Sequence, residues 1–197
     1  IYTLSLHDAL PISTSASTGA AVAQILAANA DTSAATGAAS QTETSGGWDE
    51  SGATAITLNG DSATASGTGA ASVSADGSTI TITASGTYVL SGTLSDGEIV
   101  AAADKADVHL VLNGASITNA DGPAIDVRDA GSAVLVLARG SDNALADGAA
   151  YADTGEDAAT AALFSSDTLT ITGTGSLTVT SAYKDGISSK NGLAVRG

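Results

Sequence analysis

Acidic side chains in turns are the residues of this sequence best placed to do chemistry. Those that fall in turns or in one long polar stretch are Asp121, Asp147, Asp153, Glu156, Asp157 and Asp185. Calcium takes several oxygen ligands from carboxylates and backbone carbonyls, so turn carboxylates that come together could bind it. An Asp-Gly pair is also ordinary turn chemistry. The pattern predicts at least one calcium ion on the chain, although turn chemistry alone explains any single Asp.

No familiar catalytic arrangement accompanies these carboxylates. The sequence has no HExxH, no GxSxG and no glycine-rich phosphate loop ending in lysine. His109 lies between Val108 and Leu110 in an alternating stretch, on the face opposite the leucines. We therefore expect His109 to be a solvent-facing strand residue and not a base.

The elements that must position the carboxylates are short strands joined by tight bends. In the stretch 167–197, Leu169, Ile171, Leu177 and Val179 alternate with Thr and Ser, and glycines separate the runs. Stretches that begin at Asp107 and Ser132 have the same form. Repetition of one strand-and-turn unit is typical of a stacked solenoid. Because the repeated unit contains strands only, we predict an all-β chain that forms a parallel β-helix.

The spacing of the repeats gives the length of one coil, meaning one pass of the chain around the β-helix. Val108 to Val134 is 26 positions and Leu169 to Leu193 is 24. Stacked strands of neighbouring coils would lie about 4.8 Å apart. The stretch 147–162 is extra, polar and acidic, so we expect an exposed inserted loop. The predicted core residues are Leu110, Leu112, Ile117, Ile125, Val127, Val134 and Val136.

Composition limits the class of protein and its partners. Of 197 residues, 21 are acidic and six basic, for a formal net charge of −15, and every basic residue lies at or after Lys105. Without a basic patch the chain is not expected to bind nucleic acid or an anionic membrane surface. The aromatic content of 3% suits the narrow aliphatic interior of a β-helix. No cysteine is present, so disulfides contribute nothing.

The two ends of the sequence differ from its middle. Residues 1–13 (IYTLSLHDALPIS) resemble the translation of a sequencing adapter, so we exclude them and expect that a signal peptide has been lost. Residues 14–47, rich in Ser, Thr, Ala and Gly, are predicted to be a disordered tether. We expect Trp48 to begin the folded domain, 48–197, and to cap an end of its core. The pattern stops mid-strand at Gly197, which predicts a β-helix truncated at its C-terminus.

Five motifs occur in order along the folded part of the sequence: ITLNGDSATASGTG, GTYVLSGTLSDGEIV, HLVLNGASITNADGPAIDV, AALFSSDTLTITGTGSLTV and AYKDGISSKNGL. Together they resemble a family of secreted bacterial carbohydrate-binding proteins. The resemblance implies a right-handed, single-stranded parallel β-helix shaped like polysaccharide lyases. It also implies binding of cellulose or polygalacturonate, bound calcium, and export, often as a surface lipoprotein. The DGI motif at Asp185 is the clearest match, so Asp185 is the first calcium candidate, followed by Asp121 and Asp157.

Three functions remain open at this point. The first is non-catalytic binding of plant cell-wall polysaccharide at the bacterial surface, by a monomer with structural calcium. The second is a polysaccharide lyase, in which Lys184 beside Asp185 would be the base near the ion. The third is a structural surface solenoid or adhesin with no affinity for glycans. An acidic protein should repel polygalacturonate, so binding of that ligand would need a bridging cation.

Overall fold

The computed structural model describes residues 39–69, 71–73 and 77–196. The predictions for 1–13 and for 14–38 therefore lie outside the described residues. Among those described, no helix is long and apolar enough to cross a bilayer. The elements are α2 (Gln41–Thr44), β1 (Thr54–Gly60), β2 (Ala63–Ser66), β3 (Ala71–Val73), β4 (Thr79–Ile82), β5 (Gly86–Leu94), β6 (Glu98–Ala102), β7 (Val108–Asn119), β8 (Ile125–Asp129), β9 (Ala133–Leu137), β10 (Asp142–Asp147), β11 (Ala161–Ser165), β12 (Leu169–Gly173), β13 (Ser176–Thr180), β14 (Asp185–Ser189) and β15 (Leu193–Val195).

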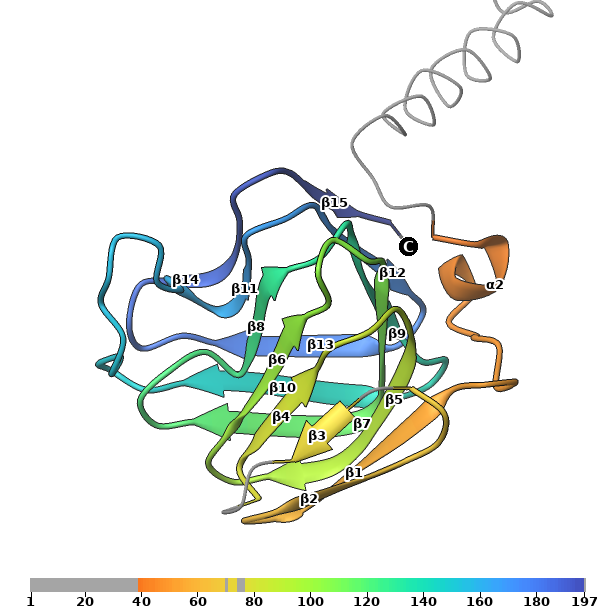
Figure 1. Ribbon diagram of the computed structural model, residues 1–197, viewed down its shortest axis with the longest axis horizontal. Helices are drawn as coiled ribbons and strands as arrows, with labels where there is room; N and C mark the ends of the chain where they lie inside the picture. Colours follow the sequence, from red (N-terminus) through yellow and green to blue (C-terminus); the bar gives the residue numbers. More distant parts are fainter. Residues whose placement is uncertain (1–38, 70, 74–76, 197) are drawn as a thin grey trace, which may run out of the picture. The chain divides into compact units, whose positions relative to one another are not determined.

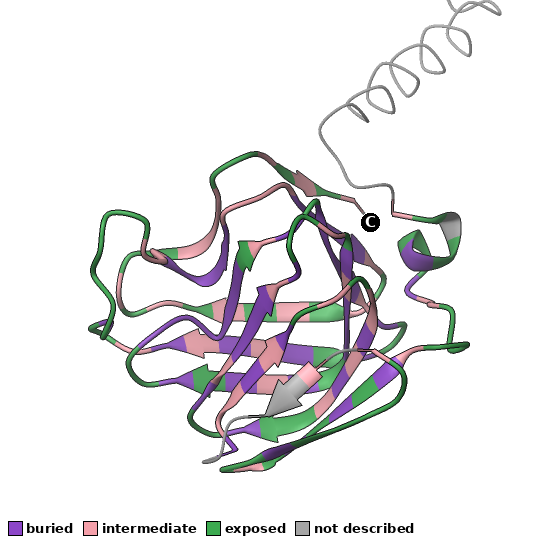
Figure 2. Cartoon of the chain, viewed as in Figure 1, coloured by how far each residue is buried: buried purple, intermediate pink, exposed green. Residues whose placement is uncertain are grey.

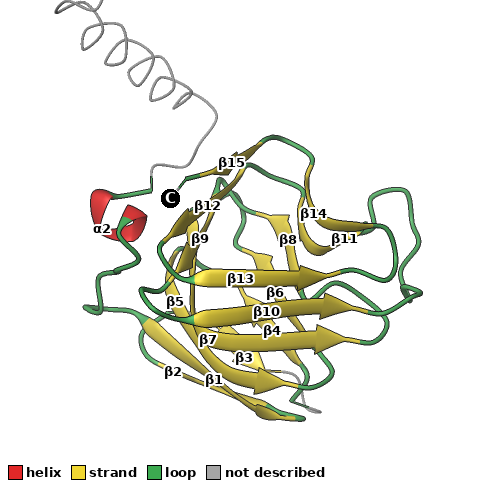
Figure 3. Ribbon diagram, turned by 180° about the vertical axis from the view of Figure 1, so that it is seen from behind, coloured by secondary structure: helices red, strands yellow, loops and turns green. Residues whose placement is uncertain are grey.

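The strands form two sheets whose members come from alternating parts of the chain (Figures 1 and 3). The larger sheet runs β15-β12-β9-β7-β5-β1-β2, with β10 and β13 beside the second half of β7, and the smaller sheet runs β14-β11-β8-β6-β4-β3. Every pairing is parallel except β1 with β2 and β3 with β4, which lie at one end of the stack. The prediction of a mostly β chain with parallel sheets is confirmed.

The register between neighbouring parallel strands agrees with the sequence at one position and differs at another. Leu169 pairs with Leu193, as predicted. Val108, however, pairs with Ala133 and not with Val134. Since side chains of a strand alternate between faces, this one-residue difference turns every residue of β9 to the opposite side.

The main core therefore contains most of the predicted residues but not all of them. Leu110, Leu112, Ile117, Ile125 and Val127 point inward and are buried there, and Figure 2 shows buried residues along the central strands of both sheets. From β9 it is Ala133 and Leu135 that join this core. The prediction that Val134 and Val136 lie in it is wrong, because they belong to a second cluster with Val111 and Ala138.

The second cluster lies on the outer face of β7 and β9 and is covered by the segment 39–48. Ala39 and Trp48 pack against it. Trp48 thus covers a face formed by strands in the middle of the sheet order, and not the end of the core as expected. Residues 39–47, assigned to the tether from the sequence, contain α2. They also contact β9 and its following turn, where the N–H of Arg139 donates to the carbonyl of Gly46 at 2.8 Å.

Removing the Trp48 side chain tests this packing. Trp48→Ala is expected to lower the free energy of unfolding by about 2 kcal/mol, less than the cost for a fully buried Trp because this ring is only half-buried. Urea unfolding followed by circular dichroism measures the change. Trp48 is the only Trp of the chain, so its fluorescence in the native protein should also be blue-shifted from that in urea. Identical emission in both states would contradict the packing.

Candidate functional site

The candidate site begins with two charged residues on the outer face of β8. In the sequence Ile125-Asp126-Val127-Arg128, the aliphatic residues point into the core. Asp126 and Arg128, at the alternate positions, therefore point outward on the same face. The Nε of Arg128 donates to Oδ2 of Asp126 at 2.6 Å.

Asp126 is buried although it lies on an outer face. Its partners on the neighbouring strands are Val100 of β6 and Phe164 of β11, and both of those side chains are buried. Only 4% of Asp126 is exposed. Burial raises the pKa of Asp126, against the opposing effect of Arg128. Its second carboxylate oxygen, Oδ1, is buried without a hydrogen-bond partner. A buried acceptor of this kind is costly, which suggests that it serves a ligand.

Glu98 of β6 completes a chain of charges around the guanidinium. Its Oε2 lies 3.7 Å from Nη2 of Arg128. Burial raises the pKa of Glu98, and the charges of Asp126 and Asp121 add to this effect while Arg128 opposes it. Burial alone would lower the pKa of Arg128, but its hydrogen bond and ion pair with Asp126, together with Glu98, outweigh burial and raise that pKa. The guanidinium is thus held in its charged form.

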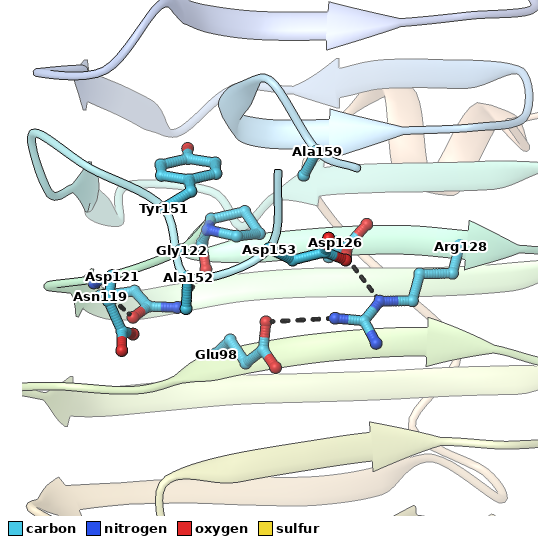
Figure 4. Close-up of a pocket in the computed structure, with 11 residues that line it drawn as sticks. Glu98, Asn119, Asp121, Gly122, Asp126, Arg128, Tyr151, Ala152, Asp153 and Ala159 are labelled. Atoms are coloured by element: carbon cyan, nitrogen blue, oxygen red, sulfur yellow. Dashed lines mark hydrogen bonds and ion pairs between the residues drawn. The ribbon is translucent and has the colours of Figure 1, made fainter. Parts of the chain in front are cut away.

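These side chains line a cavity closed by the inserted loop between β10 and β11. The cavity measures about 140 Å³, enough for several water molecules or one polar edge of a small ligand. Figure 4 shows Glu98, Asp126 and Arg128 along the sheet, with Asp153 of the loop beside Asp126 and Ala152 also in the lining. A second, more open hollow of about 350 Å³ adjoins it and shares Asp126, Arg128 and Asp153. Together the two hollows follow the outer face across β8 and β11.

The inserted loop is attached firmly near its start. The hydroxyl of Tyr151 donates to Oδ2 of Asp147 at 2.8 Å, and the Tyr151 ring stacks on that of Tyr183 with centroids 4.2 Å apart. Asp147 also accepts hydrogen bonds from the Ser181 hydroxyl and the Ala182 N–H, on the next coil. Burial and the hydrogen bond to Asp147 raise the pKa of Tyr151, so its hydroxyl stays a donor. The expected exposed insertion is present, but Tyr151 is buried within it.

The three residues predicted as calcium ligands lie in different places. Asp121 is exposed and lines the cavity. Asp157 lines the adjoining hollow and forms an exposed ion pair with Lys190, with Nζ 3.1 Å from Oδ1. Asp185 begins β14, is exposed, and lines neither hollow. Within the described ranges, no three Asp, Glu, His or Cys side chains are grouped closely enough to hold a metal ion.

Lys184 and His109, the other two residues considered from the sequence, each contact a neighbouring side chain outside the cavity. The Nζ of Lys184 lies over the ring of Tyr183, 4.8 Å from its centroid, and Lys184 does not line the cavity. His109 lies opposite the leucines as expected, but it is not simply facing solvent. Its Nδ1 contacts the buried Oε1 of Glu43 from α2, and 27% of its side chain is exposed. His109 is only partly exposed because the segment 39–48 covers this outer face.

The sequence patterns do not identify Asp126, Arg128 and Glu98 as site residues. A signal exists for the first two, because Ile125 and Val127 are predicted core residues and the residues alternating with them must share the outer face. The burial of Asp126 had no such signal. It depends on Val100 and Phe164, which are 26 and 38 positions away in the chain.

Comparison with known proteins agrees with this architecture. Residues 76–197, more than half of the chain, match the model of a family described as carbohydrate-binding domain-containing proteins. The chain belongs to this family. A carbohydrate-binding domain-containing protein of Acetivibrio thermocellus is 36% identical over 121 residues, which are 60% of this chain and 42% of that protein.

A solved structure extends the comparison to the fold of this carbohydrate-binding-domain family member. It is the gadolinium derivative of a polysaccharide lyase-like protein from C. thermocellum, with a TM-score of 0.66 and 33% identity. The match covers 72% of the present chain and 58% of the other. The chain thus spans less than half of the curated relative and somewhat over half of the similar structure.

Proposed function

We propose that this chain is a right-handed parallel β-helix that binds a polysaccharide without cleaving it, through the cavity at Asp126 and the hollow beside it. The observation that carries the proposal is Asp126, a residue that lines the cavity and whose buried Oδ1 has no hydrogen-bond partner. Sugar hydroxyls donate hydrogen bonds, and a carboxylate accepts such bonds readily. Membership of the carbohydrate-binding family supports the ligand class.

Binding without cleavage follows from the state of the basic residues. β-Elimination needs a base to remove a proton from the sugar ring. Arg128 is the only Lys or Arg that lines the cavity, and its raised pKa keeps it protonated. Lys184, stacked on Tyr183, lies outside the cavity lining. We therefore propose that no unsaturated sugar product forms, and ultraviolet absorbance of the reaction mixture measures this directly.

The ligand and its setting extend the same proposal. We propose a plant cell-wall-type polysaccharide, cellulose or polygalacturonate, bound outside the cell or at the bacterial surface. The charge of −15 and the hydroxyl-rich outer strands suit a protein exposed to solvent. The cavity takes only a short part of such a chain, and the adjoining hollow over Phe164 and Ser166 offers room for its continuation.

Asp126→Asn tests the site. We expect retention on insoluble polysaccharide to fall about tenfold, because the amide replaces an acceptor with a donor and loses the charge that orders Arg128. Depletion of protein from solution by cellulose or pectin gives the affinity. Glu98→Gln provides a second variant if Asp126→Asn folds poorly by circular dichroism.

Glu156→Gln is the matched control for this change. It removes one carboxylate from the inserted loop between β10 and β11, and Glu156 lines neither hollow. We expect it to bind like the native chain. Native affinity in folded Asp126→Asn and Glu98→Gln proteins would show that the polysaccharide binds elsewhere.

Structural calcium is a separate part of the proposal. Asp121 and Asp126 both border the cavity, and their oxygens suit a hard cation, whereas Arg128 opposes one. Asp157 and Asp185 would need backbone carbonyls to complete a site. We expect millimolar calcium to raise the melting temperature by a few degrees relative to excess chelator, because an ion that binds only the folded state stabilises it.

Charge-removing variants locate the ion. Asp121→Asn, Asp157→Asn and Asp185→Asn should each be compared with the native chain in calcium, and in magnesium as the ionic-strength control. If calcium no longer raises the melting temperature of one variant, the carboxylate that this variant lacks is a calcium ligand. An equal melting temperature in calcium and in chelator would remove calcium from the proposal and leave the glycan site intact.

A further inference from the structure

The inserted loop places one carboxylate, that of Asp153, at the junction of the two hollows. Two hydrogen bonds position the backbone around it. The N–H of Ala152 donates to the carbonyl of Asp121 at 2.7 Å, and the N–H of Gly155 donates to Oδ1 of Asp153 at 2.9 Å. Tyr151, two positions before Asp153, is itself held in place by Asp147 and Tyr183. Figure 4 shows Asp153 beside Asp126. The loop thus brings a distant acidic residue to a defined position.

The charge around the cavity is strongly unbalanced. Four carboxylates line it, from Glu98, Asp121, Asp126 and Asp153, against the single guanidinium of Arg128. That guanidinium already donates to Asp126 and faces Glu98. A sugar carboxylate would find no unengaged cation in this lining and would meet repulsion from several sides. An uncharged sugar would instead donate hydrogen bonds from its hydroxyls to the carboxylates that line the cavity.

We infer that the inserted loop is the specificity element of this site, and that Asp153 makes the cavity select uncharged, hydroxyl-rich sugars over uronic acids. This inference rests on the proposed glycan function. It chooses between the two polysaccharide classes left open there. Asp153 is a specificity-determining residue here because it adds negative charge where Asp126 and Arg128 face the ligand.

Binding of two matched oligosaccharides tests the inference. Cellohexaose and hexagalacturonate are titrated into the whole chain in excess chelator, at low and high salt. At low salt the native chain should bind cellohexaose at least about tenfold more tightly than hexagalacturonate. High salt should reduce this ratio of affinities, because it screens the repulsion of the uronic acid. Asp153→Asn keeps an acceptor oxygen but removes the charge, so it should narrow the ratio at least about threefold. Glu156→Gln should leave the ratio unchanged.

Each outcome separates this inference from the proposed function. Equal or tighter binding of hexagalacturonate by the native chain in chelator overturns the inference, while the glycan function stands. An equal change in Asp153→Asn and Glu156→Gln also overturns it, because the effect would then reflect total charge and not position. Absence of binding to either oligosaccharide and to both insoluble polysaccharides overturns the function itself.

Discussion

Asn143→Ala is expected to lower the free energy of unfolding by about 4 kcal/mol, among the largest effects of any single substitution. Asn143 lies on β10 and only 4% of it is exposed. Its Oδ1 accepts hydrogen bonds from the backbone N–H groups of Gly114 and Ala115, each at 3.0 Å. Its Nδ2 donates to the Ser141 hydroxyl and to the carbonyl of Ser176. One side chain thus joins three parallel strands, β7, β10 and β13.

The size of this effect follows from the partners that would be left behind. Alanine would leave the Gly114 and Ala115 N–H groups and the Ser176 carbonyl without this partner, and the hydrogen bond to Ala115 is fully buried. Each buried unpaired group costs about 1–3 kcal/mol. The register of β5 with β7 shifts at this point, so no other strand residue pairs with Gly114 there. Urea unfolding of the intact chain measures the change.

Asn59→Ala is the matched control. Asn59 is exposed on β1, and its side chain donates only to the nearby carbonyl of Thr57 at 3.3 Å. We expect a change within about 0.5 kcal/mol. If both alanine variants were equally stable, the hydrogen bonds between coils would not contribute as inferred.

Arg128→Met is expected to destabilise the protein by about 3 kcal/mol at neutral pH. The substitution removes the cation that pairs with the buried carboxylate of Asp126 and leaves that charge between Val100 and Phe164. The effect is smaller than for a fully buried pair because half of the Arg128 side chain is exposed. Lys190→Met is the control, since Lys190 pairs with the exposed Asp157 and should contribute less than about 0.5 kcal/mol.

The dependence of this effect on pH has a defined sign. The folded-state pKa of Asp126 is raised, so the folded protein holds that proton more tightly than the unfolded chain does. The resulting stabilisation is complete below the ordinary aspartate pKa of about 4 and is lost as pH rises through the folded-state value. Without Arg128 the pKa rises further. The cost of Arg128→Met should therefore shrink toward pH 4, and a cost independent of pH would contradict a charged Asp126.

Local patterns in the sequence determined the secondary structure and much of the core. Alternation in the stretch 107–119 placed Leu110 and Leu112 on one face and His109 on the other, because side chains of a strand alternate with a period of two. The run Ala133–Leu137 carries no such information, since apolar residues occupy both faces of β9. The outer face is apolar because the segment 39–48 covers it, and the sequence alone does not show that cover.

By itself, then, the sequence determined that the chain is mostly β with parallel strands, where the insertion lies and which alternating residues share a face. The tertiary structure alone decided that β9 pairs one residue out of the predicted register. It also decided that Asp126 is buried and that Asp153 lines the same cavity. The physical reason is the distance along the chain over which each property is set. Alternation along a strand is a local property of the backbone, whereas burial and electrostatics at the site depend on strands and a loop from different coils, brought together only when the coils stack.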